Sequence, residues 1–325
     1  MATYKEINSA GVQNFSSDPA NPLNGQVWYN TTSSTLKVAE VNTTGSWATG
    51  GNMPTGRQDL GGCGTQTAAL AFGGKQPDTA ATFEYNGSSW TAGGNLGAAK
   101  YGIGGAGTQT AGLAFGGASP PSVSITAVTE EYNGTAWTAV NNMGTGRYNL
   151  GGCGTQTAGL AFGGRSNGSP PVENKTEEYD GTNWTNGGNM PTARYNIAGC
   201  GTQTAGLAIA GTPPTTNLTF EYNGTAWTGG GTLNVGVRDH MAAAGIQTAA
   251  IAFGGNYFGV KAETELYDGS SWTTGGNLNT ARSRLAGAGT QTAGLGFGGY
   301  STGTFQNATE EFTGPGATIE TVTTS

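Results

Sequence analysis

Short apolar runs alternate with glycine-rich turns along most of the chain, and the same order of runs recurs six times. Each copy contains Gln-Thr-Ala, then an apolar stretch, then a pair of small residues that is Gly-Gly in five copies. The repeat glutamines lie 43, 47, 47, 44 and 44 residues apart, at Gln66, Gln109, Gln156, Gln203, Gln247 and Gln291. A period in the forties built from short strands is typical of a propeller array.

One copy, residues 190–227, shows the four strands that we predict for each unit. Residues 194–201 are small and form a first strand, residues 204–209 alternate as a second, and residues 219–222 form a third. Asn223-Gly224 is a strong tight-hairpin signal, and it places Trp227 on a fourth strand. Small residues suit innermost strands crowded around an axis, whereas large aromatic residues fill the space between outer strands. The sequence therefore predicts an all-β, six-bladed propeller with four-stranded blades.

The two ends of the repeat array complement each other. The sixth copy stops after its third strand, and its missing tryptophan strand stands at the other end of the array, at residues 46–49. We predict that this N-terminal strand completes the last blade, and that deletion of residues 1–56 destabilises the whole propeller. A competing candidate for that edge is residues 318–322, which alternate but lack a tryptophan.

Composition excludes several classes of protein. Glycine accounts for 60 of 325 residues, charged residues for only 10%, and the net charge is −7. Without a basic run, binding of nucleic acid through its phosphates is not expected. No apolar run is long enough for a membrane span, and no apolar stretch near residue 1 predicts a secretory signal. Cys63, Cys153 and Cys200 share their repeat position with alanine in the other copies, which indicates small buried side chains rather than disulfides.

Residues 45–314 resemble the kelch repeat. The matching elements are Pro-x-x-Arg at residues 54–57 and 191–194, Gly-Gly after the second strand, and a tyrosine followed by a tryptophan five residues later, as in Tyr85 and Trp90. Ala210-Gly211 replaces one Gly-Gly and Phe312 replaces one tyrosine. Kelch proteins are propellers used mostly for binding, so the resemblance implies the fold and a binding role.

Residues 1–44 differ in character. The segment 21–38 reads as a β-hairpin and is similar to the Gly-Gln-(Ile/Val)-Trp-Tyr-Asn segments of tail fibres and other virion proteins of tailed bacteriophages. The resemblance implies a docking arm in which Trp28 and Tyr29 contact other virion proteins, followed by the propeller at 45–314 and a C-terminal tail at 315–325. It also implies a location on the virion, where several copies can form a homo-oligomer.

Six cations precede their repeat glutamines by nine residues each, at Arg57, Lys100, Arg147, Arg194, Arg238 and Arg282. They could form an anion-binding rim, or each could pair with a carboxylate of the third strand. We favour a structural cation ring, because a residue present in every blade usually serves the blade. The expected partners are Glu84, Glu131, Glu178, Glu221, Glu265 and Glu311. The glutamines could likewise bind sugar hydroxyls, but turn chemistry explains them more simply.

The loops after the Gly-Gly pairs vary from 10 to 14 residues, and nearly all length variation between copies lies there. We expect them on the same face as the cation-bearing loops, opposite the Thr-Gln and Asn-Gly turns. Variable loops on a rigid scaffold commonly carry binding specificity, although plain solvated loops are the alternative. The candidate binding residues are Pro120, Pro121, Arg165, Asn167, Tyr257, Phe258 and Tyr300.

The sequence offers little for catalysis. It has one histidine, His240, and no paired carboxylates, nucleophile elbow or phosphate loop, so we expect no enzyme activity, no cofactor and no metal. Three hypotheses remain: a phage virion protein that contacts a host cell-surface glycan or receptor, an intracellular kelch-type scaffold for protein interaction, and a secreted lectin or glycan-cleaving enzyme.

Overall fold

The computed structural model describes residues 12–121, 123–169 and 171–322, and all their regular secondary structure is strand. The described residues divide into two compact units, one formed by residues 12–46 and 314–322 and the other by residues 47–313. The segment 1–11, on which the expectation of no secretory signal rests, lies outside the described residues.

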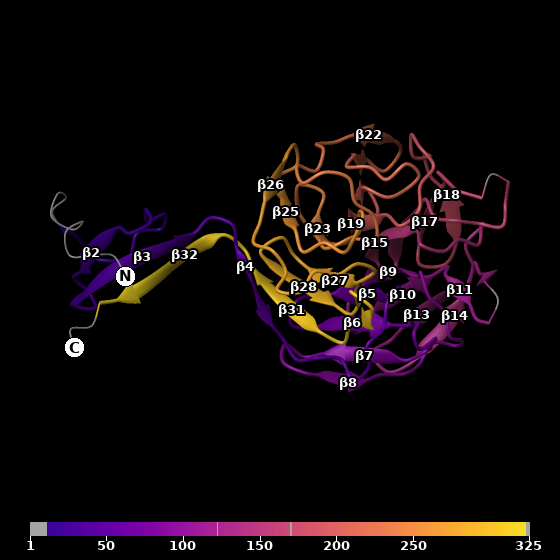
Figure 1. The fold of residues 1–325 in the computed structure, drawn as a ribbon, viewed down its shortest axis with the longest axis horizontal. Coiled ribbons are helices and arrows are strands. Elements are labelled where there is room, and N and C mark those ends of the chain that lie inside the picture. Colours follow the sequence, from indigo (N-terminus) through magenta and orange to yellow (C-terminus); the bar gives the residue numbers. More distant parts are fainter. Residues whose placement is uncertain (1–11, 122, 170, 323–325) are drawn as a thin grey trace. The chain divides into compact units, whose positions relative to one another are not determined.

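The larger unit contains six four-stranded sheets, which we number as blades one to six (Figure 1). Blade one is β5 (Gly61–Gly64), β6 (Ala69–Phe72), β7 (Thr82–Tyr85) and β8 (Trp90–Ala92); blade two is β9 (Gly104–Gly107), β10 (Gly112–Phe115), β13 (Thr129–Tyr132) and β14 (Trp137–Val140); blade three is β15 (Gly151–Thr155), β16 (Ala158–Phe162), β17 (Thr176–Tyr179) and β18 (Trp184–Asn186). Blade four is β19 (Ala198–Thr202), β20 (Ala205–Ile209), β21 (Thr219–Tyr222) and β22 (Trp227–Gly229); blade five is β23 (Ala242–Ile246), β24 (Ala249–Phe253), β25 (Thr264–Tyr267) and β26 (Trp272–Thr274); blade six is β27 (Ala286–Gly289), β28 (Ala293–Phe297), β31 (Thr309–Thr313) and β4 (Ser46–Thr49).

The six blades surround a common axis. Each blade is an antiparallel meander, and its first strand contacts the first strands of both neighbouring blades, including β27 against β5. Figure 1 shows these first strands innermost and the tryptophan-bearing strands outermost. The prediction of an all-β, six-bladed propeller is confirmed.

The sixth blade takes β4 as its fourth strand, as the sequence predicts. The Trp47 ring lies 5.1 Å from Phe312 of its own blade and 4.8 Å from Phe253 of blade five. Asn279 donates a hydrogen bond to the Trp47 carbonyl at 3.2 Å. The N-terminal strand is therefore packed into the same surroundings as the fourth strand of every other blade.

Six apolar clusters fill the six boundaries between blades. A leucine or isoleucine of each second strand, a tyrosine or phenylalanine of each third strand and a tryptophan of each fourth strand meet there. In every blade the tryptophan Nε1 also donates to a threonine hydroxyl of the preceding blade, for example Trp137 to Thr82 at 2.9 Å and Trp47 to Thr264 at 3.0 Å. Burial of a large ring with its polar atom satisfied is what makes each boundary stable.

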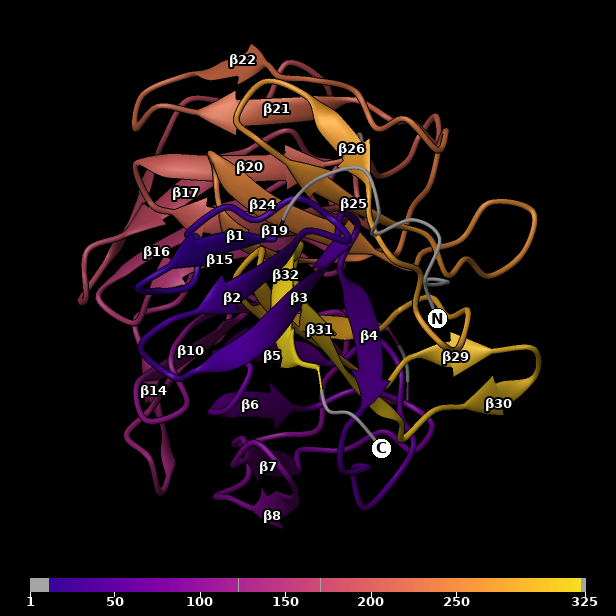
Figure 2. The same ribbon diagram turned by 90° about the vertical axis from the view of Figure 1, so that its left-hand side faces the viewer.

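The first strands begin later than expected. In blade four the strand starts at Ala198 rather than at residue 194, because Arg194 turns inward and Asn196 has a φ of +56°, which interrupts extended backbone. The second and third strands match the predicted ranges closely. Two loops contain short hairpins, β11 (Ala118–Ser119) with β12 (Ser124–Ile125), and β29 (Tyr300–Ser301) with β30 (Thr304–Phe305), the latter visible in Figure 2.

The smaller unit is one four-stranded sheet in the order β1 (Gln13–Phe15), β2 (Val27–Asn30), β3 (Thr35–Asn42) and β32 (Gly316–Thr321). Figure 2 shows β2, β3 and β32 side by side. The hairpin expected at 21–38 forms as β2 and β3. The segment expected as a separate C-terminal tail, and weighed as the closing strand of the propeller, pairs instead with β3, from Lys37 opposite Thr321 to Asn42 opposite Gly316. Both ends of the described chain thus belong to this unit.

Candidate functional site

The six cations of the predicted ring are buried in the blades. Each has an exposed fraction of 3% or less, so the ring does not offer an anion-binding rim to solvent. The arginines donate from one guanidinium nitrogen to the carbonyl at the Gly-Gly position, as in Arg147 to Gly163 at 2.8 Å, and most also reach a carbonyl at the far end of the following loop, as in Arg147 to Lys175 at 2.9 Å. The buried arginine holds both ends of that loop together.

The predicted carboxylate partners of the cations were mostly wrong by one residue. In most blades the third-strand position that faces the cation is the one just before the predicted glutamate. The observed pairs are Lys100–Glu130 at 2.7 Å, Arg147–Glu177 at 2.9 Å, Arg238–Glu265 at 2.5 Å and Arg282–Glu310 at 2.8 Å. Of the expected partners only Glu265 is correct. Adjacent residues on a strand point to opposite faces, so a shift of one residue moves the carboxylate from the face that meets the cation of its own blade to the face that meets the following blade.

The remaining two arginines lie over aromatic rings instead. Arg57 is 4.6 Å from the ring centre of Phe83, and Arg194 is 4.8 Å from that of Phe220. Burial without a carboxylate lowers the pKa of the Arg57 guanidinium to about 10. Cation–π attraction to the ring face offsets part of the cost of burying the charge.

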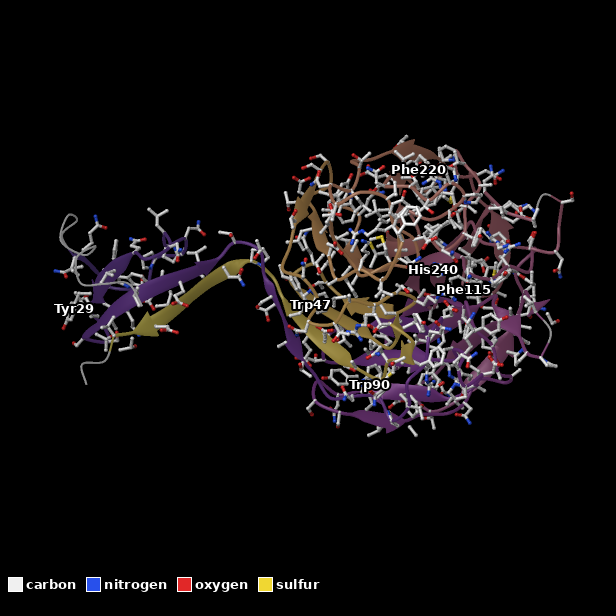
Figure 3. All side chains as sticks on the ribbon, in the orientation of Figure 1. Tyr29, Trp47, Trp90, Phe115, Phe220 and His240 are labelled. Atoms are coloured by element: carbon white, nitrogen blue, oxygen red, sulfur yellow. The ribbon has the colours of Figure 1, made fainter. Side chains whose placement is uncertain are left out.

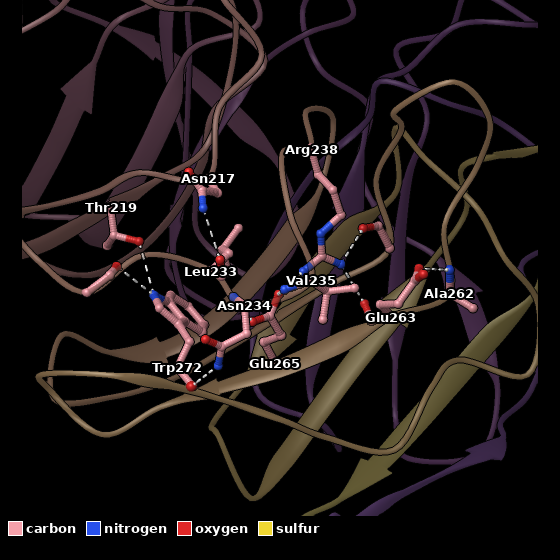
Figure 4. Close-up of polar contacts among 12 residues, drawn as sticks. Asn217, Thr219, Leu233, Asn234, Val235, Arg238, Ala262, Glu263, Glu265 and Trp272 are labelled. Atoms are coloured by element: carbon pink, nitrogen blue, oxygen red, sulfur yellow. Dashed lines mark hydrogen bonds and ion pairs between the residues drawn. The ribbon is translucent and has the colours of Figure 1, made fainter.

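The choice between glutamate and phenylalanine coincides with the absence or presence of a proline in the loop before the cation. Where a glutamate pairs with the cation, it also accepts a backbone N–H from the residue three or four before that cation, as from Gly144 to Glu177 and from Asn234 to Glu265, both at 2.6 Å. Figure 4 shows the arrangement around Arg238 and Glu265. In the two phenylalanine blades this residue is Pro54 or Pro191, which has no N–H to donate. A carboxylate there would lose one of its two partners.

The other five of the six expected glutamates join neighbouring blades. Tyrosine hydroxyls donate to them across five boundaries, with distances of 2.6 Å for Tyr132–Glu84 and 2.8 Å for Tyr179–Glu131. At the sixth boundary Leu266 and Phe312 replace both members. Burial and the adjacent carboxylate raise the pKa of Tyr85, Tyr132, Tyr222 and Tyr267 to about 12.

The repeat glutamines also connect blades, a role that differs from the turn chemistry expected for them. Each side-chain amide donates to two backbone carbonyls of the preceding blade, as Gln156 does to Gly112 at 3.1 Å and to Tyr132 at 2.7 Å. The side-chain nitrogens that could have bound sugar hydroxyls are therefore committed within the propeller.

The opposite face carries a closed ring of backbone hydrogen bonds around the axis. One residue from each blade donates its N–H to the carbonyl of the corresponding residue in the preceding blade, at distances of 2.7 to 3.2 Å. All six have positive φ, between +51° and +62°. We call them the axial ring: Asp59, Gly102, Asn149, Asn196, His240 and Arg284. Figure 3 places His240 near the centre of the propeller.

A cavity of about 140 Å³ opens at the axial ring and is lined by all six of its members. The apolar residue that comes directly after each axial-ring residue in the sequence, such as Leu60 or Ile103, also lines this cavity. A second cavity of about 120 Å³ lies at the other end of the axis and is lined by Cys63, Cys153 and Cys200 together with small residues. The three thiols are free, as expected, and burial raises the pKa of Cys63 and Cys200 to about 12, which makes them poor nucleophiles.

The candidate loop residues lie on the face of the axial ring. Backbone bridges join the loops after Gly-Gly to the cation-bearing loops, including Tyr148 with Arg165 and Ser283 with Tyr300. Asn167 and Pro121 are exposed, Pro120 and Tyr300 are half-buried, and Phe258 is the most exposed large apolar residue described, at 94%. The rings of Tyr257 and Phe258 are 4.4 Å apart. The candidates therefore share a face but spread over several blades.

The two residues proposed for docking have different surroundings. Trp28 is fully buried in the smaller unit, and its Nε1 donates to Asp18 at 3.0 Å, so this ring holds the sheet together. Tyr29, whose side chain points to the other face of the strand, is 37% exposed.

Catalytic groups are sparse around the cavity. His240 Nδ1 lies 2.9 Å from the Asp239 carboxylate. Across the parts of the chain that the structure describes, no three histidine, cysteine, aspartate or glutamate side chains gather in a way that could hold a metal ion. The same described residues contain no helix with the length and apolarity needed to cross a membrane.

Comparison with solved structures identifies the architecture. The structure of YjhT superposes with a TM-score of 0.66 over 81% of this chain and 96% of YjhT, at 14% sequence identity. This likeness supports the propeller fold and nothing finer. No family model and no curated protein sequence matches the chain.

Proposed function

We propose that this chain is a non-catalytic structural protein of a tailed-phage virion, and that its propeller contacts saccharides on the host surface. One observation carries the binding part of the proposal. The polar and aromatic residues that recur in every blade are buried and bonded within the propeller. The residues that differ between blades lie on the face of the axial ring. A rigid scaffold with one variable, partly hollowed face is what ligand recognition needs.

The smaller unit supports the virion part of the proposal. Its β2–β3 hairpin carries the Gly-Gln-Val-Trp-Tyr-Asn segment whose resemblance points to virion proteins, and it gathers both ends of the described chain. Its outer strands, β1 and β32, present backbone groups of the kind that pair with a strand from another protein. Attachment to other virion proteins through this unit leaves the propeller free for its own ligand.

Absence of catalysis is proposed from the cavity itself. The residues around it supply one imidazole and one pair of oppositely charged side chains, Arg284 and Asp59, which bond to each other at 3.2 Å. Hydrolysis of a glycoside ordinarily needs two carboxyl groups facing one bond.

Two measurements test the proposal. Mass spectrometry and antibody labelling of purified phage particles are expected to find this chain on the virion; its restriction to the interior of uninfected cells would support an intracellular scaffold instead. Incubation of the intact protein with purified bacterial polysaccharides is expected to give binding without new reducing ends. Release of reducing ends would identify a glycan-cleaving enzyme.

A further inference from the structure

The residue just before each member of the axial ring is not the same in all blades. It is tyrosine in the three consecutive blades two, three and four, at Tyr101, Tyr148 and Tyr195, and it is Gln58, Asp239 and Ser283 in the other three. All three tyrosines are half-buried, so part of each ring is accessible. Nothing in the packing of a blade requires an aromatic residue at this position, since three blades form without one.

These tyrosines come from three consecutive blades and form an arc with two cations, of which Arg165 also pairs through its backbone with Tyr148. The rings of Tyr101 and Tyr148 meet edge to face at 6.4 Å. The ammonium of Lys75 lies 4.6 Å from the centre of Tyr101 at one end, and the guanidinium of Arg165 lies 5.1 Å from that of Tyr195 at the other. Burial raises the pKa of Tyr101. The arc is therefore a preorganised surface, with its rings fixed by their neighbours.

Side-chain amides stand next to the arc on the axis. Asn149 donates to Asn196 at 2.8 Å, which leaves further donor and acceptor positions on both amides. A side chain at Gly102 would meet the Asn149 carboxamide oxygen at 2.3 Å, so glycine in blade two leaves room for that amide beside the cavity. Flat amphipathic rings beside amides combine rigid contact area with adaptable hydrogen bonding.

The two carboxylates in or beside the axial ring already have partners. Asp59 pairs with Lys75 at 2.9 Å and with Arg284 at 3.2 Å, and Asp239 contacts His240 at 2.9 Å. A ligand that carried a net charge would have to compete with these contacts. A neutral ligand rich in hydroxyl groups would not.

We propose that Tyr101, Tyr148 and Tyr195, with Asn149 and Asn196, bind a neutral saccharide. A sugar ring has an apolar C–H face that packs on a tyrosine and an edge of hydroxyls that the amides and tyrosine hydroxyls satisfy. The inference rests on saccharide binding as proposed above, and it places the site at the axial cavity and its arc rather than at the tips of the long loops. It does not depend on the virion location.

The other blades supply variants that the fold already accommodates. Tyr148→Ser copies Ser283 of blade six, and Asn149→Gly copies Gly102 of blade two and keeps the positive φ. Phe258→Ser removes the exposed ring at a loop tip and tests that position as the competing site. The matched control is Val123→Ser, at another exposed apolar loop residue. The probe is a panel of immobilised lipopolysaccharides and capsular polysaccharides, both neutral and acidic, with affinity measured by surface plasmon resonance and folding checked by the melting temperature.

We expect the full-length protein to bind a neutral polysaccharide of the panel. Tyr148→Ser and Asn149→Gly should each weaken that binding about tenfold or more with the melting temperature unchanged, because a central aromatic or amide contact dominates a small interface. Val123→Ser should bind as the unmodified protein does. Loss of binding in Phe258→Ser alone would overturn the inference and keep the proposed function. Preference for acidic polysaccharides would contradict the inference that the ligand is neutral. Absence of binding by the unmodified protein would contradict the proposal that the propeller binds saccharides at all.

Discussion

A buried guanidinium must be neutralised or stacked, and this propeller uses both solutions at equivalent positions. Arg147 has Glu177 and Arg194 has Phe220, and the difference is tied to whether the preceding loop carries a proline. The third-strand residue, the cation and the loop amide therefore act as one set of three, and a change in one member has to be judged with the other two.

At the residue scale, replacement of Arg147 by methionine should destabilise the protein by about 3–5 kcal/mol, because it leaves the Glu177 carboxylate buried without its cation. The double variant Gly144→Pro with Glu177→Phe should instead stay close to the unmodified protein, since it installs the set found in blades one and four. Urea unfolding measures both. An equal loss of unfolding free energy in the two variants would contradict the idea that proline and phenylalanine can together replace the glutamate beside the arginine.

Alkaline pH tests the buried tyrosines. Four of them have pKa values near 12 in the folded protein, against 10.0 for a free tyrosine. Between these values the folded state holds protons that the unfolded state has lost, so stability falls as pH rises through this window and is fully present below it. The urea midpoint should therefore drop between pH 10 and 12. Tyr132→Phe should drop less steeply, and an identical slope would contradict the assignment.

At the scale of elements, neighbouring blades are joined by a small set of repeated bonds: tryptophan to threonine, glutamine to two carbonyls, and tyrosine to glutamate. The boundary between blades five and six shows which of these tolerate exchange. There Leu266 and Phe312 replace the glutamate and the tyrosine together, whereas the tryptophan and glutamine contacts persist.

This paired replacement predicts a double-mutant cycle at the boundary of blades two and three. Glu131→Leu alone removes the acceptor of the Tyr179 hydroxyl and should cost stability, because a buried hydroxyl is left unpaired. Adding Tyr179→Phe should recover part of that loss, with a coupling energy of about 0.5–3 kcal/mol. Additive losses in thermal or urea unfolding would mean that water serves the hydroxyl as well as the carboxylate does.

The sequence was sufficient for the blades and insufficient for the contacts between them. Period, hairpin turns and tryptophan spacing predicted six four-stranded sheets and the place of Trp47. The alternation of residues in a four-residue strand does not show which of Glu130 and Glu131 faces the cation of its own blade. The two glutamates are adjacent, so one points to each face whichever way the strand is oriented. Two paired replacements in the sequence resolve this ambiguity. A proline before the cation occurs together with a phenylalanine in place of the first glutamate, and Leu266 in place of the second glutamate occurs together with Phe312 in place of the tyrosine. The axial ring was hidden, since positive φ at His240 or Arg284 has no signal in residue type.

At the scale of the whole molecule, closure of the propeller depends on a strand far from its neighbours in sequence. Trp47 reaches Phe312 and Phe253 in blades whose other strands come from the last third of the chain. The fifth and sixth blades are thus held together by a strand from the other end of the array. Contacts that need both ends of the array are expected to make unfolding of the propeller more cooperative.

Two truncations separate the strand from the smaller unit. Removal of residues 1–45 and 314–325 keeps β4 and should leave the melting temperature of the propeller nearly unchanged. Removal of residues 1–49 and 314–325 deletes β4 and should lower it by roughly 10 °C or more, since loss of a buried tryptophan alone costs about 3–5 kcal/mol. Equal melting temperatures in scanning calorimetry would show that the propeller is held without this strand.

The axial ring has a practical consequence. Its six bonds connect main-chain atoms only, so the identity of the side chain at Asp59, Asn149 or Arg284 does not decide whether they form. A library randomised at these positions, weighted toward glycine, asparagine and aspartate because of their tolerance of positive φ, should yield mostly folded members. Selection from such a library would turn one natural propeller into a source of binders with chosen preferences.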